Sequence, residues 1–224
     1  YLFHVQNDGM TADAFRITGH AGGTYWNVRY YRMDTGTEIT AQVAGAGMLT
    51  NALAPGAYVW LSAVVTPVNG LAAGETFTLS VTAVSAGETT RRDVAKGATT
   101  VAVSWRPDMK LRTPETATYA GDNLYNTSGA GQTIAQSCHS GKSATYLFHA
   151  QNDGNAADVL KITGPAGSTG WSVRYYNMAN GAEITEQITG AGYVTGSLAP
   201  GGYFWLSAVV SPAGTLPTGA AFTV

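Results

Sequence analysis

Charged side chains are scarce in this sequence. Asp, Glu, Lys and Arg make up 12% of its 224 residues, and the formal net charge is −2. That charged fraction is about half of what soluble proteins usually carry. Without a basic excess there is no basis for binding nucleic acid or an anionic membrane. Because 45% of the residues are hydrophobic, we expect packed domains with a surface poor in charge.

Long apolar runs and cysteines are scarce as well. No apolar stretch approaches the roughly 20 residues of a membrane-spanning helix, so no membrane insertion is expected. The sequence has neither an initiator Met nor a signal peptide, which predicts that any targeting segment lies outside it. Its single cysteine, Cys138, excludes an internal disulfide framework. We favour a small residue on a half-buried strand at this position; a thiol that links chains is the alternative.

What the sequence does contain is a long repeat. Residues 1–79 align without a gap to residues 146–224, at a constant offset of 145. About 47 of the 79 aligned positions are identical, which indicates an array of near-copies. A period of this length is typical of whole domains in series.

The repeat also predicts where the domains meet. The connecting segment 80–145 occurs once, whereas the repeated segment occurs twice. We therefore expect the sequence to be a window on a longer array, with exposed strand edges covered by other sequence or by a neighbour. We expect the boundary between two modules to lie before Arg106-Pro107, because proline disfavours the continuation of a strand ladder. This gives one module at 1–105 without its N-terminal strands and another at 106–224 without its C-terminal strands.

The apolar pattern has period two, and β-branched and aromatic residues dominate it. No helix is expected. Turn signals rich in Asn, Asp, Pro and Gly separate the runs, and the sequence has 28 glycines. The pattern predicts an all-β fold of antiparallel β-sandwich modules. The expected strands are 1–6, 14–18, 26–33, 38–43, 58–66, 76–84, 99–105, 110–112 and 132–138.

One strand is apolar on both faces. In 58–66, Leu61 and Ala63 share a face with other aliphatic residues, while Trp60 and Val64 occupy the opposite face. A strand with one solvated face should carry polar residues there, so we expect both faces to be covered, the outer one by a neighbouring module or chain. Side chains alternate between the two faces of strand 26–33, which places an Arg and a Tyr together on its outer face. We expect their contact to have cation–π character. The predicted interface residues are Tyr58, Trp60, Val64, Arg29 and Tyr31, with Tyr203, Trp205, Val209, Arg174 and Tyr176 in the second copy.

Four short patterns carry a family resemblance. They are LAPG-x4-L-x-A-x-V-x-P, the QNDG turn, W-x-VRYY (GW-x-VRYY in the second copy) and GxEIT. Together they resemble bacterial tandem immunoglobulin-like repeats of the NEW3/CARDB type, over essentially the whole chain. The resemblance implies tandem immunoglobulin-like antiparallel β-sandwich modules in a large secreted or surface protein. It implies no shared catalytic residues. Relatives usually place polar residues where this chain has Trp60 and Val64, which favours a module adapted to packing.

Candidate chemical sites are weak by comparison. His4 and His149 recur, but they lack partners at metal-ligand spacing, and we expect partly exposed interface histidines. The GDNLYN segment supplies candidate oxygen ligands for Ca²⁺, although turn chemistry alone explains them. These candidates are Asp122, Asn123 and Asn126. No other cofactor is expected.

Catalytic residues are not expected. The recurring carboxylates Glu38 and Asp13 have no obvious acid, base or nucleophile partner. Nucleotide-binding and hydrolase motifs are missing as well. The sequence therefore predicts a non-enzyme.

Two functions follow from these expectations. The first is a structural repeat of an extracellular or cell-surface assembly, such as a filament, sheath or surface layer, whose partners are copies of itself. The alternative is an adhesion, carbohydrate-binding or spacer module, because exposed aromatic rings stack on sugars. The aliphatic residues around those rings favour protein–protein packing.

Overall fold

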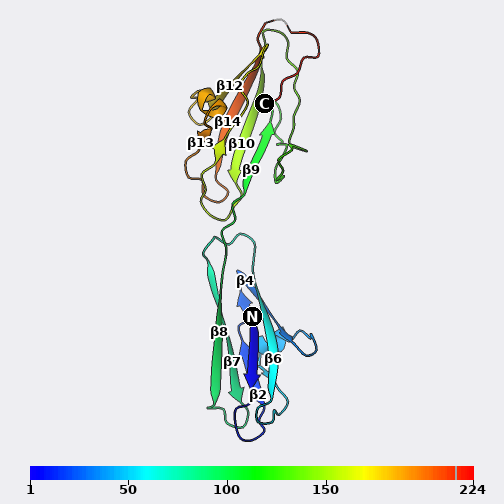
Figure 1. The fold of residues 1–224 in the computed structure, drawn as a ribbon, viewed down its shortest axis with the longest axis vertical. Coiled ribbons are helices and arrows are strands. Elements are labelled where there is room, and N and C mark those ends of the chain that lie inside the picture. Colours follow the sequence, from blue (N-terminus) through cyan, green and yellow to red (C-terminus); the bar gives the residue numbers. More distant parts are fainter. Residues whose placement is uncertain (215) are drawn as a thin grey trace. The chain divides into compact units, whose positions relative to one another are not determined.

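The computed structural model describes residues 1–214 and 216–224 and is nearly all β, with 42% of residues in strands and 4% in helices. The prediction of an all-β chain is confirmed at this level. The chain divides into two compact units, Tyr1–Ala102 and Val103–Val224 (Figure 1). The expected boundary lay close by, between residues 105 and 106. We describe each unit by itself.

Unit 1 contains two four-stranded antiparallel sheets, with strand orders β1-β6-β4-β3 and β5-β2-β7-β8. The first sheet is built from β1 (Leu2–Gln6), β3 (Gly22–Gly23), β4 (Trp26–Arg32) and β6 (Tyr58–Pro67). The second is built from β2 (Phe15–Gly19), β5 (Met48–Leu49), β7 (Thr76–Ser85) and β8 (Arg92–Thr100).

The core of unit 1 lies between these sheets, in a sandwich-like arrangement. The first sheet contributes Tyr30 and Leu61, and the second contributes Ile17 and Leu79, all fully buried. Each buried aliphatic side chain stabilises the fold by about 1.5–3 kcal/mol relative to exposure. The Tyr30 hydroxyl donates a hydrogen bond of 3.0 Å to the His20 carbonyl, so its burial leaves no unpaired polar group. Burial raises the pKa of Tyr30 to about 12.

Unit 2 contains a four-stranded antiparallel sheet in the order β12-β14-β10-β9 and a two-stranded sheet, β11-β13. The strands are β9 (Pro107–Arg112), β10 (Ala144–Asn152), β11 (Lys161–Ile162), β12 (Trp171–Asn177), β13 (Tyr193–Val194) and β14 (Tyr203–Pro212). Phe222 and Val224 pack against the core, and the Phe222 ring stacks 6.1 Å from that of Trp171. Pro107 occupies the first position of β9, where its missing N–H costs least.

The two units share strand register in the sheets that contain β6 and β14, whereas the second sheet has four strands in unit 1 and two in unit 2. β6 lies between β1 and β4 in unit 1, as β14 lies between β10 and β12 in unit 2. His4 pairs with Trp60, and the equivalent His149 pairs with Trp205. The repeated segments therefore build equivalent central strands, and the units differ at the edges of their sheets.

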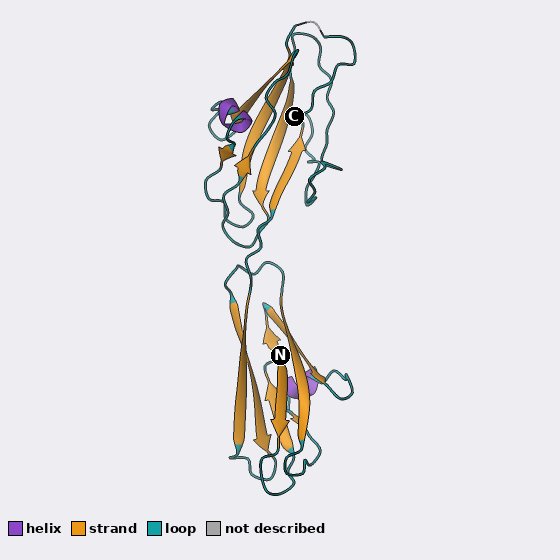
Figure 2. Cartoon of the chain, viewed as in Figure 1, coloured by secondary structure: helices purple, strands orange, loops and turns teal. Residues whose placement is uncertain are grey.

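The expectation that no helix forms is wrong at one position of the repeat. α1 (Thr40–Ala44) and α2 (Thr185–Thr189) are short helices, coloured purple in Figure 2, and α1 replaces most of the strand expected over 38–43. Ile39 and Val43 are both buried, and the Val43 N–H donates to the Ile39 carbonyl at 3.0 Å. A spacing of four places them on one side of a helical turn. Over so few residues, this pattern also fits an alternating strand.

Two other strand predictions fail for lack of a pairing partner. The strand expected over 99–105 lies mostly earlier, because β8 pairs with β7 from Val84↔Arg92 to Thr76↔Thr100 and the ladder ends there. The segment 132–138 forms no strand at all. Apolar and polar residues alternate in this segment as they do in a strand, but no neighbouring backbone pairs with it. Cys138 is half-buried in this irregular segment.

Gly19 lies against the Tyr30 ring, and a methyl group there would collide with the phenol oxygen and with Val43. We expect Gly19→Ala to lower the free energy of unfolding by about 1–3 kcal/mol through overpacking. Gly23→Ala is the matched control, because a Cβ at Gly23 meets nothing within 4 Å, and its effect should stay within about 0.5 kcal/mol. Urea unfolding followed by tryptophan fluorescence measures both. Equal stabilities of the two variants would contradict this packing.

Candidate interaction surface

β6 in unit 1 and β14 in unit 2 are inner strands of four-stranded sheets, and each presents a row of large side chains on its outer face. In antiparallel sheets, residues paired across strands project from the same face. Val64 of β6 pairs with Arg29 of β4, and Ser62 pairs with Tyr31. We call this set the unit 1 stripe: Tyr58, Trp60, Val64, Arg29 and Tyr31. The register of β14 with β12 places the equivalent residues together as the unit 2 stripe: Tyr203, Trp205, Val209, Arg174 and Tyr176.

The unit 1 stripe is exposed except for the half-buried Tyr31, although all of its residues but Arg29 are large and mainly apolar. Tyr58 is 55% exposed, Trp60 43% and Val64 50%, whereas the alternate residue Leu61 is 2% exposed. In unit 2, Tyr203 and Trp205 are similarly exposed and Val209 is half-buried. The two faces of β6 therefore have opposite environments despite similar apolarity.

His4 extends the unit 1 stripe onto β1. Its ring lies 4.5 Å from the Trp60 ring and 4.7 Å from the Tyr58 ring, and those two rings are 6.5 Å apart. The sequence signals for an interface position here were the alternation along 1–6, which sets His4 opposite to Phe3, and the lack of partners at metal-ligand spacing. The three rings form one exposed aromatic cluster on the outer face of the sheet.

His149, the equivalent residue in unit 2, has a different environment. It is 7% exposed, because β9 pairs beside it and the Tyr119 ring lies 5.6 Å away. The expectation of partial exposure is wrong for this histidine. Burial, and then the nearby charge of Lys110, lowers the pKa of His149. Its Nδ1 is buried without a hydrogen-bond partner, which favours the uncharged ring.

The arginines of the stripes are paired rather than free. Arg29 lies 4.0 Å from Glu38, and Arg174 lies 3.9 Å from Glu183. Such exposed pairs add little to stability because water screens them. A hydrogen bond with Tyr176, and then the charge of Glu183, raises the pKa of Arg174. The expected Arg-Tyr contact is thus polar in unit 2, and in both units the neighbouring glutamate balances the charge of the stripe arginine.

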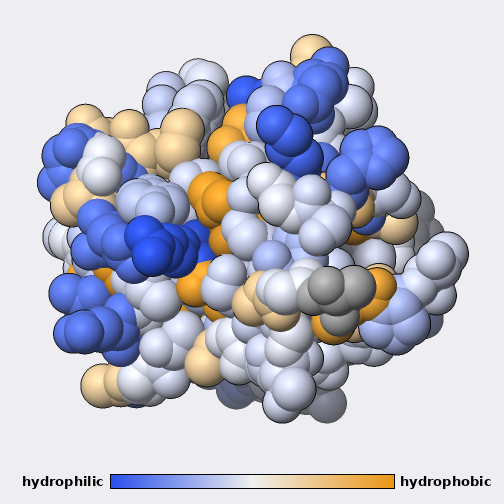
Figure 3. Space-filling model, turned by 90° about the horizontal axis from the view of Figure 1, so that it is seen from above, coloured by the Kyte–Doolittle hydropathy of each residue, from blue (hydrophilic) through white to orange (hydrophobic). Residues whose placement is uncertain are grey.

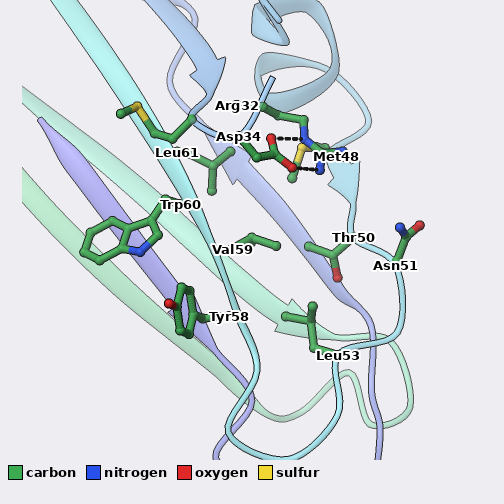
Figure 4. A pocket seen from close by; sticks show the side chains of 11 residues that line it. Arg32, Asp34, Met48, Thr50, Asn51, Leu53, Tyr58, Val59, Trp60 and Leu61 are labelled. Atoms are coloured by element: carbon green, nitrogen blue, oxygen red, sulfur yellow. Dashed lines mark hydrogen bonds and ion pairs between the residues drawn. The ribbon is translucent and has the colours of Figure 1, made fainter. Parts of the chain in front are cut away.

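A shallow pocket of about 320 Å³ adjoins the unit 1 stripe. Figure 4 shows Val59 projecting toward Thr50, on the other side of β6 from Trp60. The charged groups in its lining are Arg32 and Asp34, which pair with each other at 2.6 Å. This ion pair lowers the pKa of Asp34 through a hydrogen bond from Arg32. The pocket thus offers an apolar floor with a neutralised polar rim.

The calcium candidates hold other partners. The Asp122 carboxylate accepts a hydrogen bond from the Lys110 ammonium. The Asn123 side chain accepts one from Tyr125 at 3.2 Å, and Asn126 bonds to Ser128 in a local turn. Across 1–214 and 216–224, no three His, Cys, Asp or Glu side chains gather around a common point. Calcium binding stays a prediction.

Lys110 is the centre of a partly buried charge cluster in unit 2. Its ammonium lies 3.9 Å from Asp108 and 3.1 Å from the Gln151 amide oxygen. Asp108 is fully buried, and this burial raises the pKa of its carboxyl. The cluster secures β9 against β10 and the segment that follows β9.

A comparison with protein families found no family model that matches this chain, and a comparison with curated proteins found no match either. No helix in the described part of the chain is long and apolar enough to cross a membrane.

His149 should give unit 2 a distinct pH dependence. Its pKa in the folded chain lies below the ordinary value of 6.5. Between these two values the unfolded chain binds more protons, so the free energy of unfolding falls as the pH is lowered below 6.5. We expect His149→Gln to remove the part of this decrease in the free energy of unfolding that comes from protonation of His149. Urea unfolding of both proteins at about pH 8 and about pH 5 tests it. Identical pH dependence of the two proteins would contradict the prediction.

Proposed function

We propose that this chain is a non-enzymatic structural protein whose tandem modules assemble with copies of themselves at the cell surface or outside the cell. Its modules are immunoglobulin-like β-sandwiches of the NEW3/CARDB type, and the assembly is a filament, sheath or surface layer. The single observation that carries the proposal is the exposed apolar stripe on the central strand of each unit.

Position on a central strand makes the stripe suited to packing. β6 is hydrogen-bonded on both sides, so its outer face is rigid and its ring positions are fixed by the register. Covering an exposed Trp or Tyr ring stabilises a contact by about 2 kcal/mol at the usual value per unit of apolar area. Several such rings on each copy are enough to supply the buried centre of an interface.

Low charge supports association between identical copies. The net charge is −2 over 224 residues, and the stripe arginines are paired with glutamates. Repulsion between copies is therefore weak. On the face drawn in Figure 3, strongly hydrophilic residues gather at the left and the upper right, and paler and hydrophobic residues lie between them.

Because each unit carries a stripe, one chain has two faces that can bind other copies. Trp60 and Trp205 hold the same position in their sheets and pair with equivalent histidines. Two binding faces on one chain allow growth into an extended array, whereas a single face ends at a dimer.

A carbohydrate-binding or adhesion module is the second candidate. The aromatic cluster of His4, Tyr58 and Trp60 favours it, because its exposed rings lie within 4.5–6.5 Å of one another. Flat exposed rings can stack on sugar faces. The aliphatic Val64 and Leu2 beside them are also exposed, and they suit a protein partner better.

The assembly proposal predicts that Trp60→Lys combined with Trp205→Lys leaves the chain folded but abolishes association. Both rings lie on an outer face, so the core is untouched, while two charges enter the contact. Analytical ultracentrifugation and electron microscopy measure assembly, and circular dichroism measures folding. Val94→Lys with Val194→Lys is the matched control, because both valines are exposed outside the stripes, and it should assemble like the wild type. Unchanged assembly of the tryptophan variant would place the interface elsewhere.

A glycan array separates the two candidates. If the chain assembles through the stripes, the monomeric tryptophan variant and the wild type should both fail to bind glycans. Binding by the wild type that is lost on Trp60→Ala, without any change in sedimentation, would overturn assembly in favour of the carbohydrate-binding function.

A further inference from the structure

β1 of unit 1 has one open edge. It lies at the end of its sheet and pairs on one side with β6. Tyr1 and Asn7 direct their backbone groups to β6, through hydrogen bonds of 2.8–2.9 Å to Ala63 and Ala57. Backbone groups alternate in direction along an antiparallel strand. Those of Leu2, His4 and Gln6 therefore point to the open edge.

The same edge is occupied in unit 2. β9 pairs antiparallel with β10, with Leu111 opposite Phe148, Lys110 opposite His149 and Asp108 opposite Gln151. β1 and β10 share the sequence LFH-x-QN. A strand with the sequence of β9 would therefore meet the same backbone and nearly the same side chains on β1.

Burial differs between the two edges because β9 covers β10 and no described strand covers the same side of β1. Ala150 of β10 is 1% exposed and His149 is buried, whereas their equivalents Val5 and His4 are half-buried and exposed. Leu111 of β9 is buried on the inner side of unit 2. A β9-type strand on β1 would place Leu111 beside Phe3 and cover Val5 in the same way.

The open edge also lacks the usual protection. Edge strands of soluble proteins commonly carry charged side chains that block pairing with another chain. The other long edge strand of unit 1, β8, has Arg92, Asp93 and Lys96. β1 reads LFHVQ and carries no charged side chain. Its backbone is thus available for strand addition.

We propose that the open edge of β1 binds a β9-type strand, with the sequence Pro107–Arg112, from a second copy of this repeat. The added strand runs antiparallel in the β9–β10 register, with Lys110 opposite His4. The contact consists of backbone hydrogen bonds at a sheet edge and a buried Leu111. It uses the edge of the sheet rather than the outer face, meets the unit 1 stripe only at His4, and goes beyond the proposed assembly through the stripes.

The probe is a synthetic peptide of residues 106–120. It extends to Ala120 because Leu111 and Ala120 exchange backbone hydrogen bonds of 3.0 and 2.8 Å in unit 2, which satisfy the outer edge of β9. At saturating peptide, we expect amide exchange at Leu2, His4 and Gln6 of the full chain to slow by about tenfold or more, measured by NMR. The matched control is the same peptide N-methylated at Lys110. It keeps every side chain but removes one N–H that faces the partner strand, and it should bind at least about tenfold more weakly.

Three results would overturn the proposal. Unchanged exchange at Leu2, His4 and Gln6 means that the edge does not accept this strand. Protection confined to β10 means that the peptide only exchanges with β9 in unit 2. Protection of β1 that rises with protein concentration and excludes the peptide means that β1 pairs with β1 of another copy. Loss of assembly in the tryptophan variant, together with no peptide binding, leaves the proposed function standing and removes this inference.

Discussion

Pairing of β6 with a strand on each side is the constraint on which unit 1 depends. The ladders to β1 and β4 satisfy its backbone and set which residues face inward. A slip of one residue would expose Leu61 and bury Trp60. Core, outer stripe and pocket are therefore consequences of one register, and β14 imposes the same order on unit 2.

That register also separates two kinds of contact surface. The backbone groups in the middle of the sheet are all paired, so only side chains can bind a partner there. The exposed side chains on that face are mainly aromatic and aliphatic. The end of the sheet has free backbone groups at β1, so a strand can bind there with little help from side chains. The proposed assembly face and the proposed strand-addition edge lie on one sheet but rest on different chemistry, which is why each can be tested alone.

Much of the fold could be predicted from the sequence because period-two alternation is a local signal. The strands around Trp26, Trp60 and Leu79 were expected close to their observed bounds. The helix at Thr40–Ala44 was missed because a spacing of four over six residues resembles a strand, and burial of Ile39 and Val43 decided for the helix. Segment 132–138 alternates correctly yet forms no strand, since a strand also needs a partner that no local pattern reveals.

The sequence by itself determined the repeat, the strand faces and the apolar outer row, because these follow from the order of residues along one strand. Only the tertiary structure decided which strand ends a sheet and which is covered. His4 and His149 lie in the same YLFH context, yet one is exposed among aromatic rings and the other is buried with a lowered pKa. The difference comes from β9, which is distant in sequence from β1 and pairs with β10 but not with β1. Burial depends on neighbours in space, and identical sequences acquire different chemistry when those neighbours differ.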